Sequence, residues 1–171
     1  VDGGGISFVG ASRAGKSTAL LLASSVCGGT QEAGARGYAR SWRSTSNGLE
    51  SVALASCDAL LPMDEIGQLD PKEIGDVAYM LANGQGKVRA SRTGGARATA
   101  RWRVLFLSTG EKTLDDLNNE AGRTTKAGQE VRFCDIPADA GQGMGLFENT
   151  HHYDSPGEFA DYLGSACGQY Y

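Results

Sequence analysis

Histidines, closely spaced cysteines and long apolar runs are scarce or absent in this sequence, and each scarcity excludes a class of protein. The chain of 171 residues has two histidines and four cysteines, and no two cysteines form a C-x-x-C pair. Zinc sites need ligands at such short spacing, and disulfide scaffolds are usually shorter and denser in cysteine. No apolar run approaches the roughly 18 residues of a membrane span, and no secretory signal is present. We therefore expect reduced thiols, no membrane partner and a cytoplasmic location.

The composition is that of a globular domain. Hydrophobic residues make up 40% of the chain and charged residues 21%, which is typical of a folded protein. A chain of this length can bury a core of its own. Because the sequence begins at Val1 rather than at methionine, we expect residues 1–171 to be a single domain within a longer polypeptide.

Strand and helix patterns alternate along the chain. Five short apolar runs predict strands at residues 6–9, 38–42, 59–63, 104–107 and 131–136. Helices are predicted at residues 16–26, 49–57, from 70 to about 83, and 156–167. This alternation predicts an α/β fold with a mainly parallel, five-stranded sheet covered by helices.

Residues that favour helix starts stand before three of these helices. Asn47 is a plausible cap for the second helix, and Ser155 for the last. For the third helix, Asp70 followed by Glu73 predicts a capping box, with proline at the first helical position.

The stretch from Gly10 to Ser17, GASRAGKS, matches the pattern G-x-x-x-x-G-K-[ST] at every fixed position. Such a loop turns its backbone N–H groups toward phosphate oxygens at the start of a helix, where the helix dipole adds partial positive charge. We expect Lys16 to reach the β- and γ-phosphates of ATP and Ser17 to ligate Mg²⁺. A glycine-rich turn without a ligand is the alternative, and a strand before the loop with a helix after it argues against that. The predicted nucleotide contacts are Gly10, Ala11, Ser12, Arg13, Ala14, Gly15, Lys16, Ser17 and Thr18.

The third apolar run ends in the acidic pair Asp64 and Glu65. A phosphate-loop ATPase needs an aspartate at a strand tip to hold Mg²⁺ through water, and a glutamate after it can deprotonate the attacking water. The alternative is that both acids only begin a solvated loop. Pro62 lies inside this strand and lacks a ladder donor, so the strand is either bulged there or has no partner at that N–H.

Two further positions have hydroxyls or arginines that suit nucleotide hydrolysis. At the end of the fourth strand, Ser108 is the first candidate to contact the γ-phosphate or the attacking water, and Thr109 the second; an ordinary strand-end hydroxyl is the alternative. Arg123 and Arg132 lie before and at the start of the fifth strand. Arg123, in a loop, is the better candidate for an arginine supplied to a neighbouring subunit, although a surface salt bridge explains it equally well.

Residues 87–103, KVRASRTGGARATARWR, hold six basic residues and no acidic one in a chain of formal net charge −4. Read as a β-hairpin inserted before the fourth strand, they have a basic side and an apolar side, because side chains alternate between faces. Trp102 lies on the apolar side, so base stacking is not indicated. Three interpretations remain open: a nucleic-acid contact, a solvated hairpin face, and arginines that serve ATP in a neighbouring subunit. The candidate nucleic-acid residues are Lys87, Arg89, Arg97, Arg101 and Arg103.

Four stretches, SWRSTSNGLE, DEIGQLDPKEIGDVAYMLANGQGK, RTGGARATARWRVLFLSTGE and AGQEVRFCDIPADAGQG, resemble the bacterial "domain of unknown function 927" family. The similarity runs from Ile6 to about Tyr170. It implies a phosphate-loop ATPase domain of the kind found in phage, plasmid and integrative-element proteins described as helicases or primase-helicases. The order of parts also resembles the cores of AAA+ proteins and superfamily III helicases, which is an analogy of fold.

Two functions follow as expectations. The first is Mg²⁺-dependent ATP hydrolysis by the motor domain of a DNA helicase or primase-helicase, working on single-stranded or forked DNA as a homo-oligomer. The second is a slow nucleotide-dependent switch or assembly ATPase that acts on protein partners. A small-molecule kinase has less support, because the acidic pair and the hydroxyls at residues 108 and 109 suit water activation better.

Overall fold

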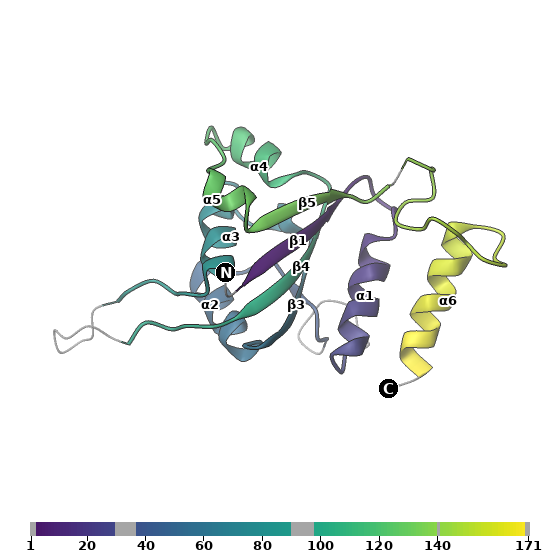
Figure 1. Cartoon of the computed structure of the whole chain (residues 1–171), viewed down its shortest axis with the longest axis horizontal. Coiled ribbons are helices and arrows are strands. Elements are labelled where there is room, and N and C mark those ends of the chain that lie inside the picture. The colour runs from purple at the N-terminus through teal and green to yellow at the C-terminus, as the bar shows by residue number, and fades with distance from the viewer. Residues whose placement is uncertain (1–2, 30–36, 90–97, 140, 170–171) are drawn as a thin grey trace.

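The structure, a computed structural model, describes residues 3–29, 37–89, 98–139 and 141–169. Within them, five parallel strands form one sheet in the order β2-β3-β4-β1-β5 (Figure 1). The strands are β1 (Gly4–Val9), β2 (Arg40–Ser41), β3 (Ala59–Asp64), β4 (Val104–Gly110) and β5 (Phe133–Pro137). The predicted α/β class and five-stranded parallel sheet are confirmed.

The helices lie on both sides of this sheet (Figure 1). α1 contacts β3 and β4 and carries α6 on its outer side, while α3 packs on β1, β4 and β5 from the other face. The helices are α1 (Lys16–Val26), α2 (Ser46–Ala55), α3 (Ile74–Asn83), α4 (Leu114–Glu120), α5 (Ala127–Glu130) and α6 (Pro156–Gln169), with a 3₁₀ turn at Ile66–Gln68.

The main hydrophobic core lies between the sheet and the α2–α3 layer. Trp42, Phe106 and Ile74 are fully buried there. The Phe106 ring meets Trp42 edge-on at 6.2 Å and stacks on Phe133 at 5.4 Å between centroids. Such aromatic contacts add to the burial of apolar area, which is the largest stabilising contribution to a fold of this size. This core packs against β4, which lies between β1 and β3. The strand that ends in the acidic pair, β3, is therefore separated by β4 from the strand that leads into the phosphate loop, β1.

Pro62 is accommodated in β3 without a bulge. The carbonyl of Asp64 accepts from the backbone N–H of Trp42 at 3.2 Å, and the carbonyl of Leu60 accepts from the Tyr38 hydroxyl at 2.9 Å. The backbone N–H and C=O groups of alternate strand residues point to the same side, so the backbone nitrogen of Pro62, which has no N–H, also faces β2. β2 pairs only with Met63 and Asp64, and its ladder therefore begins after the proline. This is why β2 has two residues where we predicted five.

Two predicted helix caps are wrong and one is confirmed. α2 begins at Ser46, and the hydroxyl of Thr45, not Asn47, accepts from a helix N–H. α3 begins at Ile74, since the carboxylate of Asp70 accepts from the N–H of Lys72 and forms a turn ahead of the helix instead of a capping box. The Ser155 hydroxyl accepts from the N–H of Glu158 at 3.2 Å, as predicted for α6.

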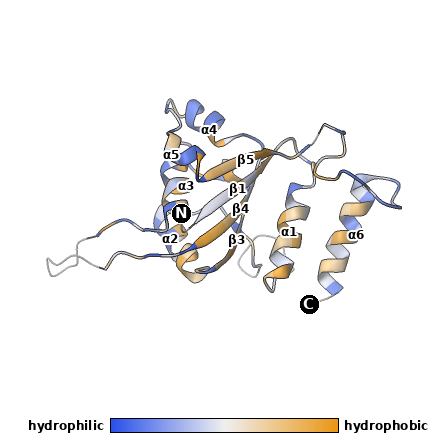
Figure 2. Ribbon diagram, viewed as in Figure 1, coloured by the Kyte–Doolittle hydropathy of each residue, from blue (hydrophilic) through white to orange (hydrophobic). Residues whose placement is uncertain are grey.

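The sequence patterns missed α4 and α5. α4 is mostly polar, as Figure 2 shows by its blue colour against the orange of β4 and β5. Its start depends on a capping box between Thr113 and Asp116 rather than on an apolar stripe. α5 is a single turn that delays the fifth strand, which begins at Phe133 and not at Val131.

The inserted segment between α3 and β4 has hairpin pairing at its base. Gln85 and Arg101 form an antiparallel bridge, and the N–H of Trp102 donates to the carbonyl of Gly84 at 3.0 Å. Its described arms extend away from the sheet, at the end opposite α1 and α6 (Figure 1). Trp102 is buried and Arg101 exposed, as the alternation predicts. Arg97 lies outside the described residues. In the described part of the chain, no helix combines the length and apolar character that crossing a membrane requires.

Candidate nucleotide-binding site

The phosphate loop connects β1 to α1 at the carboxyl edge of the sheet. Gly15 precedes α1 with φ +81°, a left-handed conformation that glycine adopts without strain, and no side chain caps the helix. The first N–H groups of α1 are therefore left without intrahelical or side-chain acceptors. Lys16 is 8% exposed, and its ammonium donates to the carbonyls of Gly10 and Ala11, both at 2.7 Å. Such an arrangement can bind an anion, because the backbone donors and the cation converge.

The acidic pair lies at the tip of β3, and Thr109 of β4 connects both of its members. The Thr109 hydroxyl donates to Asp64 Oδ1 at 2.9 Å and accepts from the N–H of Glu65 at 3.0 Å. Glu65 has φ +54°, which is uncommon for a residue with a side chain, and its carboxylate accepts from the N–H of Gly67. Strained backbone of this kind is concentrated at functional sites, where neighbouring contacts hold it. Here Thr109 supplies that contact.

Ser108 lies on the opposite face of β4 from Thr109. Its side chain is fully buried, and its hydroxyl accepts from the indole N–H of Trp42 at 3.0 Å. Because strand side chains alternate, one of the two hydroxyls faces the core and the other the site. Of these two candidates, Thr109 is the one that lines the cavity beside the phosphate loop.

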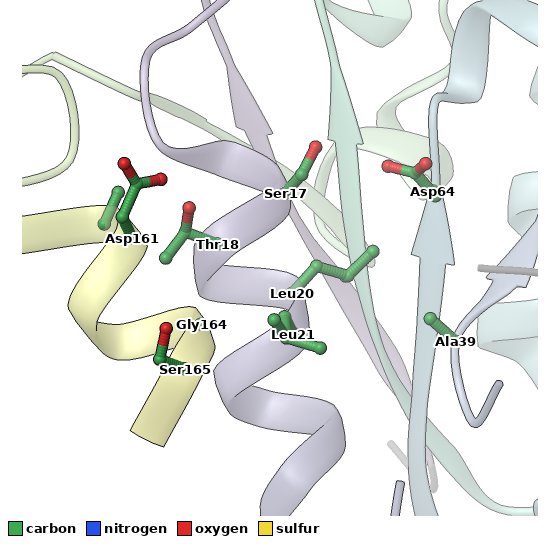
Figure 3. Close-up of a pocket in the computed structure, with 10 residues that line it drawn as sticks. Ser17, Thr18, Leu20, Leu21, Ala39, Asp64, Asp161, Gly164 and Ser165 are labelled. Carbon is green, nitrogen blue, oxygen red and sulfur yellow. The ribbon is translucent and has the colours of Figure 1, made fainter. Parts of the chain in front are cut away.

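Two neighbouring cavities meet at the start of α1. One, of about 620 Å³, is bounded at one end by the phosphate loop with Glu65, Thr109 and Glu111. The other, of about 750 Å³, is lined by residues of α1, β3 and α6 and is drawn in Figure 3. Within it, Asp64 points from β3 toward Ser17 of α1 (Figure 3).

Ser17 and Asp64 fit a magnesium site. Mg²⁺ prefers oxygen ligands and keeps several waters, so one hydroxyl and one carboxylate beside substrate phosphates are a sufficient protein contribution. Both side chains line the same cavity, next to the phosphate loop. The described residues hold no group of three or more His, Cys, Asp or Glu side chains suited to a metal.

The two candidate arginines lie away from this cavity within their own chain. Arg123 forms an ion pair with Asp76 at 3.0 Å, and both side chains are about half exposed. Arg132 donates to the carbonyl of Gly128, and its guanidinium lies 5.4 Å from the centroid of the Tyr79 ring. Arg123 is therefore held by one surface partner and Arg132 by two contacts within its own subunit.

Some cavity residues had no signal that we recognised in the sequence. Met144, Phe147, Pro156 and Asp161 complete the wall of the smaller cavity, and they come from the segment after β5 and from α6. The glycine-rich stretch before them was the available signal. A Cβ on Gly145 would lie 2.5 Å from the carbonyl oxygen of Ala14, so this glycine allows the segment to touch the phosphate loop.

The basic residues of the inserted segment are partly paired inside the chain. The guanidinium of Arg89 donates to both carboxylate oxygens of the buried Glu50, each at 2.8 Å, and this pair holds the pKa of Glu50 below its ordinary value. Arg103 forms an ion pair with Asp58 at 2.7 Å. The ammonium of Lys87 donates to the Ser46 hydroxyl at 3.3 Å. These contacts attach both arms of the segment to α2 and to the residues that follow it.

Comparison with known proteins decides the family. The model of the "Domain of unknown function (DUF927)" matches residues 1–101. The chain belongs to this family. The match covers the phosphate loop, the acidic pair and the first arm of the inserted segment, which is less of the chain than the resemblance we noted in the sequence. No curated protein matches the chain.

Among solved structures, the chain is similar to one described as "SCCmec type IV Cch - active helicase". The identity is 26% and the TM-score 0.68, over 97% of this chain and 26% of that one. The chain thus spans about a quarter of the helicase's length. NtrX from Brucella abortus also matches, with 16% identity and a TM-score of 0.40 over 81% of this chain and 33% of that chain; at this level the likeness carries no argument. The DUF927 domain therefore has a phosphate-loop, helicase-like fold.

Proposed function

We propose that this DUF927 domain binds ATP and hydrolyses it with Mg²⁺, as the motor domain of a DNA helicase or primase-helicase of a mobile element. The observation that carries the proposal is the arrangement at the carboxyl edge of the sheet. There the phosphate loop, Glu65 and Thr109 line one cavity, and Ser17 and Asp64 line the cavity next to it. The similarity to an active helicase supports the same function.

Each residue has a role in this proposal. The backbone N–H groups at the start of α1 and the ammonium of Lys16 bind the phosphates, and Lys16 exchanges its carbonyl partners for phosphate oxygens. Ser17 and Asp64 would hold Mg²⁺, the latter through water; the bound ion supplies charge neutralisation at the phosphates. Glu65 takes a proton from the attacking water. The Thr109 hydroxyl keeps the Asp64 carboxylate in position and holds the backbone of Glu65 through its N–H.

The remaining charge stabilisation comes from a second copy of the chain. Among the described residues, the guanidinium of Arg123 is held by an exposed ion pair with Asp76, and such pairs contribute little to stability. Its guanidinium can therefore leave Asp76 and reach the nucleotide of a neighbouring subunit, where it stabilises the transferring phosphoryl group.

DNA is the proposed substrate of the motor, and the inserted segment is its proposed contact. Lys87, Arg89, Arg101 and Arg103 bring several positive charges to one projecting element, which favours phosphate contacts of low sequence preference.

The slow switch or assembly ATPase is a second candidate, and one observation favours it. Arg89 is ion-paired with the buried Glu50, so less positive charge is available to DNA than the sequence indicates. The ion pair of Arg103 with Asp58 is exposed and holds its arginine only weakly. In this function the inserted segment would contact a protein instead.

One experiment separates the two functions. ATP hydrolysis is measured with and without Mg²⁺ and with and without single-stranded DNA, together with the mass of the protein in solution. A motor hydrolyses ATP only with Mg²⁺, is stimulated by DNA and forms oligomers. Slow hydrolysis that DNA does not change supports the switch, and no hydrolysis under any condition contradicts both.

A further inference from the structure

Two chemically different groups of residues line the cavity beside the phosphate loop. The loop itself, with Glu65 and Thr109, suits phosphates. Met144, Phe147 and Pro156 form an apolar group, and Asp161 lines the same cavity. The volume of about 620 Å³ is in the range of small-molecule sites. A bare polyphosphate would use only the polar residues, so the apolar group calls for a ligand with an apolar, flat part.

Direct contacts with the loop hold this apolar group in place. The N–H of Leu146 donates to the carbonyl of Ala14 at 3.0 Å. The Phe147 ring lies 3.3 Å from the point where a Cβ of Gly15 would be. The ring is thus next to the residue that precedes α1, within one ligand's length of the phosphate site.

A second aromatic residue, Phe159, packs against this ring. Phe147 and Phe159 meet edge to face, with centroids 5.0 Å apart and planes inclined by 61°. Phe159 in turn contacts Tyr153 at 5.4 Å and His151 at 5.3 Å. Phe147 is itself only partly buried. Aromatic contacts of this geometry fix ring orientation, and they leave the cavity side of Phe147 available for a ligand.

We infer that Met144, Phe147 and Pro156 form the subsite for the base of a nucleoside triphosphate, and that Asp161 accepts a hydrogen bond from its nucleoside. The inference rests on the proposed function, which supplies the phosphates. Every base has a π-face, so an aromatic ring can stack on any of them. The subsite therefore selects a nucleoside triphosphate over a bare polyphosphate.

Asp161 should affect the binding of a nucleotide and of a polyphosphate in opposite directions. It lies on α6 across from Thr18 of α1 (Figure 3) and lines both cavities. A carboxylate repels a polyphosphate but accepts hydrogen bonds from sugar hydroxyls or base N–H groups. Its removal should therefore weaken the binding of a nucleotide while leaving that of a polyphosphate unchanged or slightly stronger.

The test compares two ligands by calorimetry in the presence of Mg²⁺: a nonhydrolysable ATP analogue and inorganic tripolyphosphate. Stacking on one aromatic ring corresponds to about a tenfold effect on affinity. We expect the wild type to bind the analogue about tenfold or more tightly than tripolyphosphate. Phe147→Ala should remove most of that preference without changing tripolyphosphate binding. Tyr162→Ala is the matched control, because Tyr162 belongs to the same aromatic group through Tyr153 but does not line the cavity.

Asp161→Ala should lower affinity for the analogue several-fold and not lower it for tripolyphosphate. Equal affinity of the wild type for both ligands, or an equal loss of both in Phe147→Ala, overturns the base subsite while leaving the phosphate site intact. A preference for the analogue that Phe147→Ala does not alter also overturns it. Binding of neither ligand by the wild type contradicts the proposed function as well. Preferential binding without hydrolysis supports the subsite and contradicts only the ATPase.

Discussion

The charged side chains at the two ends of the parallel sheet have different kinds of partner. At the carboxyl end, Lys16 bonds to backbone carbonyls and Asp64 to the hydroxyl of Thr109, and no ion pair among the described residues involves either. At the amino end, where the inserted segment begins, Arg89 and Arg103 are held by carboxylates of their own chain. A charged side chain without an opposite charge beside it can bind a ligand without first breaking an ion pair. Arg89, by contrast, would have to leave the buried Glu50, which would then lack its partner. The nucleotide site is therefore better prepared for its partner than the inserted segment is.

The largest effect is expected at the carboxyl end. Lys16→Ala should lower ATP binding or turnover by about a hundredfold or more, because one cation and its contacts to two phosphates are lost. The measurement is nucleotide affinity and steady-state hydrolysis. Lys126→Ala is the control, as this exposed lysine lies in the loop before α5. If Lys16→Ala binds and hydrolyses ATP normally, the loop does not hold the phosphates and the contrast between the two ends fails.

Thr109 and Ser108 provide a matched pair within one strand. Thr109→Val should reduce turnover by roughly tenfold to a hundredfold, because Asp64 and Glu65 lose the hydroxyl that holds them. It should also lower the free energy of unfolding by about 1 kcal/mol, since the N–H of Glu65 loses its acceptor. Ser108→Ala should leave turnover nearly unchanged and lower the free energy of unfolding by about 1 kcal/mol, since the Trp42 indole loses its acceptor. Hydrolysis rates and denaturant unfolding of both variants are compared. A reversed pattern would assign the role to Ser108 instead.

The inserted segment calls for a variant that does not disturb the fold. Arg89→Glu would put a second carboxylate beside the buried Glu50, so it confounds binding with stability. Arg101→Glu is preferable because Arg101 is exposed. We expect it to reduce DNA affinity several-fold at low salt and to lower the salt dependence, while ATP hydrolysis without DNA is unchanged. Lys126→Glu makes a charge reversal at an exposed lysine that has no ion pair among the described residues, and it serves as the control. Equal DNA affinity in both variants and the wild type would favour a protein partner.

The smallest effect concerns the ion pair at the base of the segment. Glu50→Gln should lower the free energy of unfolding at neutral pH by about 1 kcal/mol, because Arg89 loses a charged acceptor. The hydrogen bonds from the Arg89 guanidinium outweigh the opposing effect of burial. Together with the N–H of Lys87, they hold the pKa of Glu50 below its unfolded value. The pair therefore stabilises the fold above that unfolded value, and the contribution is lost as pH falls through the folded pKa. Unfolding of both proteins across the acidic range should show their difference disappearing there.

Much of the nucleotide site could be predicted from the sequence, because its residues follow each other at fixed spacing or end a strand. Gly10 to Ser17 and the acidic pair are of this kind. We ranked Ser108 ahead of Thr109 from the sequence, whereas Thr109 is the one that lines the cavity. The order depends on which face of β4 meets the core, and the sequence did not give that. The helix α4 was missed because its start relies on capping and its composition is polar.

The ion pairs of the basic residues with carboxylates of the same chain could not be predicted from the sequence either. Glu50 lies on α2, about 40 residues before its partner Arg89, and only the packing of α2 beside the inserted segment brings the two together. Phe147 likewise reaches the phosphate loop through a turn of the chain after β5. Contacts of this type depend on tertiary structure, and no local pattern encodes them.

The most direct test of the account is a comparison of Glu65→Gln with the wild type. In the proposed mechanism, Glu65 deprotonates the attacking water, and the phosphate contacts are made by other residues. We therefore expect the variant to bind ATP with nearly unchanged affinity and to hydrolyse it in a single turnover with Mg²⁺ more slowly by about a hundredfold or more. Hydrolysis by Glu65→Gln at the wild-type rate would contradict the account.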